Sequence, residues 1–248
     1  MAPSRISNQS SVLKFIQNTP WRATHTQRRS PFRGQGRPPK GSWLDNVPQG
    51  AIFWGILVAN VGVFAAWAYA ENSIKVLRDT RPYIWMLQNF TSSIDNVASG
   101  RIWTILTSSF SQSSTTHLLF NGFTYFFMAR PVLSMLGNKQ FLILYLGGGL
   151  VSSITSMIWN SDRKHSSQGA SGAIYSIMTY FACCHPRTSF LLFAVIPIPA
   201  WAFVPGILAY DIYDMISTNR MTKTDTAGHI GGVLGGAAYF LARRAGRF

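Results

Sequence analysis

GASGAIYSIMTYFACCH, residues 169–185, is an apolar run that contains no Asp, Glu, Lys or Arg and begins with small residues. Its 17 residues are fewer than the roughly 20 that a helix needs to cross about 30 Å of hydrocarbon. Glycine and alanine at close spacing let neighbouring helices approach closely. The run therefore predicts a thin helix that is buried inside a membrane protein and does not meet the full bilayer.

Five further apolar runs accompany it. The six candidate spans are residues 50–70, 115–135, 140–159, 169–185, 189–210 and 226–242. The composition agrees, because 47% of the 248 residues are hydrophobic and only 12% are charged, about half the charged fraction of a water-soluble domain. We therefore expect an all-α membrane protein, with a bundle of six transmembrane helices in residues 48–248. The long connection, residues 71–114, is rich in aromatic side chains, and we expect it to lie partly in the membrane interface.

Residues 1–47 differ from the remainder in charge. The chain carries 22 basic and 8 acidic residues, a net charge of +14, and eight of the basic residues lie in the first forty positions, where no acidic residue occurs. An Arg-rich, Ser-rich N-terminus without a long apolar region is typical of a mitochondrial transit peptide, and the alternative is a plain disordered basic tail. The other 208 residues carry 14 basic against 8 acidic side chains. That small excess does not indicate binding of nucleic acid.

An even number of spans places both termini on the same side of the membrane. That side collects 14 Lys and Arg residues and the opposite side collects 8. The bias of basic residues toward the inner face then places the termini on the cytoplasmic or matrix-like side.

Three polar side chains lie near the starts of the second, fourth and sixth runs, namely His117, Ser171 and His229. The chain reverses direction with each crossing, so these three starts lie at the same face and at similar depth. Ionisable side chains inside a membrane are costly, and their default interpretation is functional. We therefore expect the three side chains to meet in one pocket that water reaches from that face.

Ser171 stands in the tetrapeptide Gly169–Gly172, which reads Gly-Ala-Ser-Gly. Glycines on both sides of a serine at a helix start permit close backbone approach and leave N–H groups that suit an oxyanion. Tyr175 lies one turn later on the same face, where its ring can pack beside an imidazole. The alternative is ordinary packing of small residues between helices. Ala173 excludes the serine elbow of soluble hydrolases, which needs glycine at that position.

His229 is followed by Gly232 and Gly236 on its own side of the helix. A helix with such a face packs its backbone closely against a neighbour, and the natural neighbour is the helix of Ser171. The imidazole would then lie within hydrogen-bond reach of the serine hydroxyl, able to act as general base and then as general acid.

No acidic residue is evident near this histidine. Asp211 and Asp214 come after the fifth run, where they look interfacial. We therefore expect a dyad of Ser171 and His229 rather than a triad.

His117 and Asn121 lie four residues apart and hence on one helical face. Both can donate hydrogen bonds to a developing oxyanion. The alternative is a polar contact that joins two helices. Neither a carboxylate nor a cysteine accompanies them, and the adjacent Cys183 and Cys184 lack the spacing of metal ligands, so we expect neither a metal nor another cofactor.

Together these residues resemble the rhomboid family of intramembrane serine proteases. The matching elements are His-x-x-x-Asn in the second run, Gly-x-Ser-Gly with a later tyrosine in the fourth, and Gly-His-x-x-Gly-x-x-x-Gly in the sixth. Each motif alone is weak, but the three in this order are specific. The resemblance covers residues 48–248, and similarity in residues 56–67, before His229 and in the tail favours the mitochondrial branch. One departure is Trp103-Thr104, where many bacterial members carry Trp-Arg.

The resemblance implies hydrolysis of a peptide bond in or near a transmembrane segment of a substrate protein, through an acyl-enzyme on Ser171 with His229 as the base. The oxyanion site would consist of His117, Asn121 and the amide of Ser171. The supporting residues would be Gly169, Gly172, Tyr175, Gly232 and Gly236. The partners would be transmembrane protein substrates and the lipid bilayer, and the location a multi-pass site in the mitochondrial inner membrane or another organelle membrane.

A second hypothesis is a catalytically silent relative that binds transmembrane helices. The presence of both Ser171 and His229 argues against it, because a binder has no need of the pair. A transporter or channel is disfavoured by the lack of carboxylates within the runs and of a repeat between the two halves. Pro197, Pro199 and Pro205 weaken a helix, so the fifth run is the expected movable wall beside the site.

Overall fold

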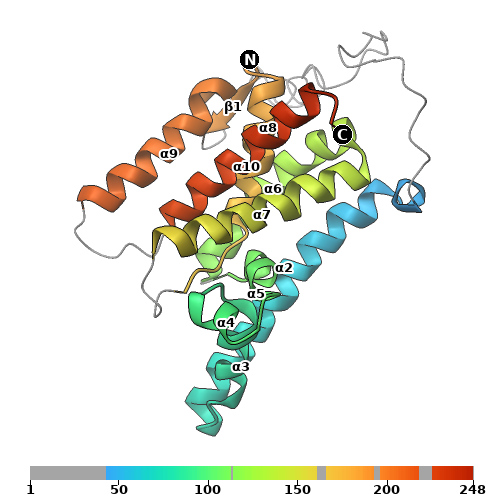
Figure 1. Cartoon of the computed structure of the whole chain (residues 1–248). Coiled ribbons are helices and arrows are strands. Elements are labelled where there is room, and N and C mark those ends of the chain that lie inside the picture. The colour runs from blue at the N-terminus through green and yellow to red at the C-terminus, as the bar shows by residue number, and fades with distance from the viewer. Residues whose placement is uncertain (1–42, 113, 161–165, 193–195, 218–224, 248) are drawn as a thin grey trace, which may run out of the picture. The chain divides into compact units, whose positions relative to one another are not determined.

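The computed structural model describes residues 43–247 apart from residues 113, 161–165, 193–195 and 218–224 (Figure 1). The described residues belong to a unit of residues 40–248, which is mostly helical and contains a short sheet. The expectation of a disordered basic tail or transit peptide falls mainly on residues 1–42, which lie outside the described part.

The first described element is a 3-10 helix, η1 (Trp43–Asn46), which the composition assigns to the tail. It is held by Asn138, whose Nδ2 donates to the carbonyl oxygens of Leu44 at 2.7 Å and Val47 at 2.6 Å. η1 thus contacts Asn138, although it lies within the segment that we predict to be the tail. The contact joins distant parts of the chain, so that no local pattern reveals it.

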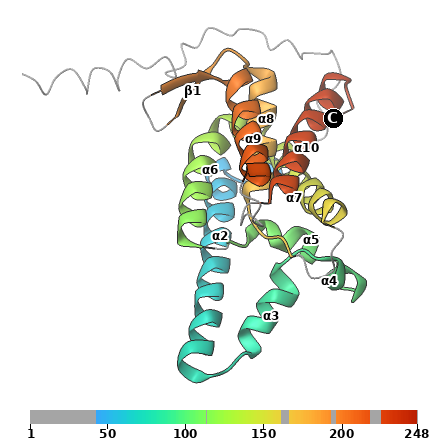
Figure 2. The ribbon, with the colours of Figure 1, turned by 90° about the vertical axis from the view of Figure 1, so that its left-hand side faces the viewer.

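The longest described helix is α2 (Gln49–Asn72), which continues into a π-helical turn, η2 (Ser73–Leu77). Its first half packs against α6 (Thr115–Leu136). Its second half extends away from the other helices together with α3 (Arg81–Phe90), as Figures 1 and 2 show. In this extension Trp67 and Met86 are buried in an apolar cluster of their own. We call residues 63–90 the α2–α3 arm.

The rest of the long connection folds into α4 (Ile94–Ala98), α5 (Thr104–Thr107) and η3 (Ser108–Phe110). Asn96 organises it, because its Nδ2 donates to the carbonyl oxygens of Leu87 at 3.0 Å and Thr91 at 2.8 Å. Arg101 Nε in turn donates to Asn96 Oδ1 at 3.0 Å. An arginine thus supports this connection from position 101, although position 104 carries threonine.

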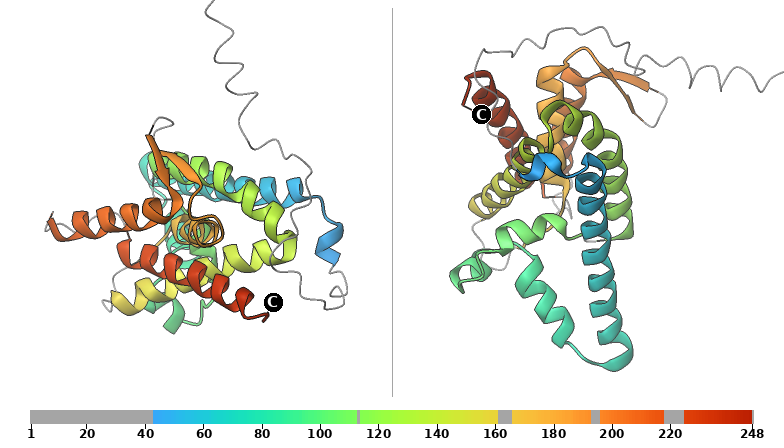
Figure 3. Two further views of the ribbon diagram at one scale, coloured as in Figure 1. Left: turned by 90° about the horizontal axis from the view of Figure 1, so that it is seen from above. Right: turned by 90° about the vertical axis from the view of Figure 1, so that its right-hand side faces the viewer.

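α8 (Ser171–Cys184) lies at the centre, against α6, α7 (Asn138–Trp159) and α10 (Thr226–Arg244). Every residue from Gly172 to Ala182 is buried, as the small residues of the run predict. Seen from above, the other helices lie around α8 (Figure 3). At 1.5 Å per residue its 14 residues measure about 21 Å, which is shorter than a bilayer core.

Glycines allow α10 to approach two helices at once. A Cβ atom added at Gly232 would lie 2.9 Å from the carbonyl carbon of Gly172, and one at Gly236 would lie 2.9 Å from Ser176 Cα in α8. On its other side, a Cβ atom at Gly231 would lie 2.8 Å from Ser152 Cα in α7. The backbones are therefore in direct contact, and side chains larger than hydrogen do not fit between them.

The fifth run differs from the expected helix over residues 189–210. Residues Ser189–Leu192 (β1) and Ile196–Pro199 (β2) form an antiparallel hairpin in which Phe190 pairs with Ile198. The helix that follows, α9, spans Ala200–Ser217. Proline at 197 and 199 disfavours helical geometry before residue 200, which explains the late start. The all-α expectation is therefore wrong at this hairpin, and Asp211 and Asp214 lie inside α9 rather than after it.

Within the described residues, two helical segments are long and apolar enough to cross a bilayer, namely Gln49–Leu77 and Asn138–Trp159. The other predicted runs also contain helices, at α6, α8, α9 and α10. Their ends agree with the predicted ends within a few residues, apart from the fifth run.

Candidate active site

Ser171 is the first residue of α8 and follows a backbone turn that requires glycine. Gly169 has φ +153°, a conformation that side-chain-bearing residues rarely adopt, and its N–H donates to Ser108 O at 3.0 Å. A Cβ atom on Gly169 would lie 3.1 Å from His117 Cε1 and 3.4 Å from Ser171 Oγ. The glycine is therefore needed both for the turn and for the space between these two side chains.

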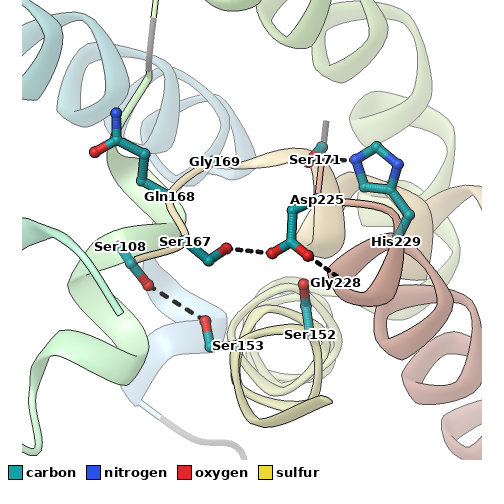
Figure 4. A pocket seen from close by; sticks show the side chains of 10 residues that line it. All are labelled: Ser108, Ser152, Ser153, Ser167, Gln168, Gly169, Ser171, Asp225, Gly228 and His229. Carbon is teal, nitrogen blue, oxygen red and sulfur yellow. Dashed lines mark hydrogen bonds between the residues drawn. The ribbon is translucent and has the colours of Figure 1, made fainter. Parts of the chain in front are cut away.

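His229 faces Ser171 from the second turn of α10. Its Nε2 lies 2.8 Å from Ser171 Oγ, which is hydrogen-bond distance (Figure 4). The whole residue His229 is 8% exposed. The two residues are 58 positions apart in the chain, and the glycine contacts between α8 and α10 bring them together. Such a pair can pass a proton from the hydroxyl to the imidazole.

An acidic side chain contacts the other ring nitrogen of His229, contrary to the sequence-based expectation of a dyad. Asp211 Oδ2, from α9, lies 2.6 Å from His229 Nδ1, and the two side chains are 11% and 10% exposed. The sequence pattern does not reveal this contact, because the fifth apolar run ends at residue 210 and leaves Asp211 outside the predicted helix. Pro199 could have indicated this contact, because proline disfavours a helix before residue 200. A helix that begins at Ala200 contains Asp211 about three turns after its start.

Tyr175 contacts both His229 and Asp211. Its ring stacks on the imidazole of His229, with centroids 4.5 Å apart and planes inclined by 26°. Its hydroxyl donates to Asp211 Oδ2 at 2.7 Å. The imidazole is therefore fixed by one ring face and one carboxylate, and it has little freedom to turn away from Ser171.

Asp225 joins the segment before Ser171 to the start of α10. One carboxylate oxygen accepts from the Gly228 N–H at 2.9 Å and caps the helix, while the other accepts from the Ser167 hydroxyl (Figure 4). Side chains of this cluster line a polar pocket beside Ser171 together with Ser108, Ser152, Ser153 and Gln168. No sequence pattern reveals this pocket, because its hydroxyl groups come from separate segments of the chain.

His117 and Asn121 lie one turn apart in α6 and occupy different surroundings. His117 borders Gly169, beside the Ser171 hydroxyl. Asn121 lines a small apolar cavity with Ala170 and Ile174, and its Nδ2 donates to Gln112 Oε1 at 2.8 Å. The structure thus brings His117 to the serine side of the site and Asn121 to the backbone just before it.

Comparison of the sequence with known proteins identifies its family. Residues 99–245 match the Rhomboid domain. The chain is 28% identical to RHOMBOID-like protein 12, mitochondrial, of Arabidopsis thaliana over 233 residues, which cover 88% of this chain and 66% of that protein. It is 30% identical to the presenilin-associated rhomboid-like protein, mitochondrial, of Bos taurus over 215 residues, or 83% of this chain and 52% of the relative. It is 26% identical to Rhomboid-like protein 16, chloroplastic, of Arabidopsis thaliana over 226 residues, which cover 84% and 66%. The chain thus spans between about half and two thirds of these relatives.

Proposed function

We propose, since the chain belongs to the rhomboid family, that it is an intramembrane serine endopeptidase that cleaves transmembrane segments of other membrane proteins. The single observation that carries the proposal is the 2.8 Å contact between Ser171 Oγ and His229 Nε2. A serine hydroxyl and a buried imidazole at this distance are the minimum machinery for nucleophilic attack on a peptide bond.

The membrane arrangement is part of the proposal. We assign α2, α6, α7, α8, α9 and α10 to six membrane helices in residues 48–248. α6 supports this assignment, because Leu119, Phe120 and Phe123 are each more than 60% exposed, as lipid-facing side chains are. α8 is too short for the bilayer core, so its first residue, Ser171, would lie below the membrane surface.

The reaction follows from the contacts. Ser171 Oγ attacks the carbonyl carbon of the scissile bond while His229 Nε2 accepts its proton. Asp211 accepts the Nδ1–H of the imidazole, keeps Nε2 unprotonated for this step and stabilises the imidazolium that forms. The imidazolium then donates its proton to the leaving amine. Water, with His229 again as base, releases the acyl group from Ser171.

The oxyanion of the tetrahedral intermediate needs donors that are in place before the reaction. The Ser171 amide is the first N–H of α8, where the helix leaves its N–H groups without partners in the preceding turn. His117 and Asn121 supply side-chain donors from α6. A substrate helix hides its own amides in hydrogen bonds, so it must unwind locally before its carbonyl reaches these donors.

α9 is the wall that we expect to move when a substrate enters, because Pro205 interrupts its hydrogen-bond ladder. A covalent crosslink that ties α9 to α6 should then lower cleavage of a transmembrane substrate. Turnover that is equal with and without the crosslink would refute the movable wall.

A labelled fluorophosphonate tests the activity directly. The purified wild-type chain should react with the probe, and Ser171→Ala should abolish the reaction. Ser176→Ala is the matched control, because it removes a buried hydroxyl from the next turn of the same helix. A catalytically silent binder of transmembrane helices, the alternative function, would give equal and low labelling in all three proteins.

We also propose the mitochondrial inner membrane as the location, with residues 1–47 as the targeting segment. The support is the Arg-rich composition of this segment, whose first 42 residues contain no Asp or Glu, and the mitochondrial names of several relatives. Fusion of residues 1–47 to a fluorescent protein should direct it to mitochondria. Delivery to plastids or retention in the cytosol would contradict this location.

A further inference from the structure

Three side-chain amides, two of them buried and that of Asn121 half-buried, form a hydrogen-bonded row from α2 to α6. Gln112 Nε2 donates to Asn60 Oδ1 at 2.9 Å, and Asn121 Nδ2 donates to Gln112 Oε1 at 2.8 Å. Asn60 is 6% exposed and Gln112 is 2% exposed. The three residues come from the middle of α2, from the segment after η3 and from the second turn of α6. The burial of Asn60 and Gln112 indicates that the hydrogen bond between them matters, because water cannot replace it.

The direction of the row follows from one backbone atom. Asn60 Nδ2 donates to the carbonyl oxygen of Ile56 at 2.9 Å, and a carbonyl oxygen can only accept. Asn60 must therefore turn Oδ1 toward Gln112. Gln112 must therefore direct Nε2 toward Asn60 Oδ1, and its Oε1 then accepts the hydrogen bond from Asn121. Each amide is thus held in one of its two orientations.

This order decides which end of the Asn121 amide serves as donor. One N–H of Nδ2 is bound to Gln112, so the second N–H has a fixed direction in the amide plane. If Asn121 turned over, its oxygen would meet Gln112 Oε1, and two acceptors would face each other in a buried place. A turned amide would also present lone pairs to a developing oxyanion.

The row ends at the candidate active site. Asn121 lines a cavity with Ala170, the residue before the nucleophile, and the same cavity contains Asn60. His117, the other predicted side-chain donor, stands one turn before Asn121 in α6.

We propose that Gln112 and Asn60 are positioning residues, which hold the Asn121 amide in the orientation that donates to the oxyanion. The inference rests on the proposed protease function and deepens it. The inference gives Gln112, near the end of the long connection, a role in the chemical step. That role is not in substrate binding, because the oxyanion exists only after attack.

The test is a double-mutant cycle on the full chain in detergent or bilayers, with kcat and KM for one transmembrane substrate. Asn121→Ala should lower kcat on the order of a hundredfold, as loss of an oxyanion donor does. Gln112→Met keeps the length of the side chain and removes the row. It should lower kcat about tenfold with little change in KM, since a lost buried hydrogen bond is worth about that factor.

The decisive comparison is Gln112→Met in the Asn121→Ala background. If Gln112 acts through Asn121, the second substitution should change kcat less than twofold there. A full tenfold further loss in that background would overturn the inference. Asn60→Leu supplies a second route if Gln112→Met fails to fold, with a loss of about threefold that depends on Asn121 in the same way.

Ser111→Ala is the matched control. Ser111 is fully buried next to Gln112, accepts from Trp67 Nε1 at 3.0 Å and donates to Phe90 O at 2.7 Å, so it also joins α2 to the connection. It should lower thermal stability and leave kcat unchanged. An equal loss of kcat in Ser111→Ala would show that Gln112 is only structural and would overturn the inference. If the wild type has no turnover that depends on Ser171, the proposed function fails and the inference fails with it.

Discussion

α10 meets α8 backbone to backbone, whereas α3 meets α2 through large side chains. In the first contact Gly232 and Gly236 leave no room for a Cβ atom. In the α2–α3 arm, the rings of Trp67 and Tyr83 pack edge to face with their centroids 5.6 Å apart. The first contact fixes the distance between Ser171 and His229, the proposed catalytic pair, and leaves no free space between the two backbones. The second is a cluster of large side chains that includes Trp67 and Met86 and contains no member of the proposed catalytic site.

This difference predicts that substitutions of equal size have unequal consequences in the two regions. Changes at the α8–α10 contact should act mainly on activity. Changes in the arm should act mainly on stability.

The largest effect is expected for Asp211→Asn, which keeps the shape of the side chain that faces His229. Asparagine can present an N–H to Nδ1, which favours the wrong tautomer and removes the charge that stabilises the imidazolium. We expect kcat to fall on the order of 10²-fold to 10⁴-fold, measured by cleavage of a transmembrane substrate. Full activity in a folded Asp211→Asn protein would show that Asp211 is not required and would favour the dyad of Ser171 and His229 that the sequence predicts.

Gly232→Ala should come next. The new Cβ atom would lie 2.9 Å from the carbonyl carbon of Gly172, so α10 must move away from α8. Overpacking of this kind costs about 1–3 kcal/mol, and we expect activity to fall further than stability because His229 moves with the helix. Thermal unfolding and turnover of the same sample measure both. Gly62→Ala, in a helix of the membrane domain where a Cβ atom meets no neighbour within 4 Å, is the control.

Tyr175→Phe removes one hydroxyl and keeps the ring that stacks on His229. Asp211 then loses the hydrogen bond at 2.7 Å, while the imidazole keeps its aromatic neighbour. We expect a loss of kcat of about tenfold, which is what one buried hydrogen bond is worth. Tyr180→Phe, from the same helix but remote from the site, should leave kcat unchanged. A similar loss in both proteins would indicate a general effect on α8.

Trp67→Phe in the arm should have the smallest effect on activity. It removes the hydrogen bond from Trp67 Nε1 to Ser111 Oγ at 3.0 Å and keeps an aromatic ring in the cluster. We expect a loss of about 1 kcal/mol in stability and less than a twofold change in kcat. A large loss of kcat would show that the arm is coupled to the site and would remove the contrast between the two regions.

The parts that the sequence predicts well are those with a periodic or compositional signal. The apolar runs locate α2, α6, α7, α8 and α10, because side-chain hydropathy alone marks where a helix can be buried. Alternation of direction places His117, Ser171 and His229 at one end of the bundle. The close glycine packing follows from the spacing of Gly232 and Gly236 on the face of His229.

The parts that it misses depend on contacts between distant segments. Asp211 escapes because Pro197 and Pro199 turn the start of the fifth run into a hairpin, which shifts the following helix. Asn60 and Gln112 escape because single amides in a helix and a connection follow no pattern. The early start at Trp43 depends on Asn138, about ninety residues away. The residues of each contact are present in the sequence, but only folding brings them together.

The central claim is that the Ser171 hydroxyl and the His229 imidazole share a proton. Its most direct test is the mass of the intact chain after reaction with a fluorophosphonate, with the adduct located by peptide mapping. We predict one adduct on Ser171 in the wild type and a rate at least about a thousandfold lower in His229→Gln. An adduct that forms equally fast in His229→Gln, or that lies on a different serine, would contradict the claim.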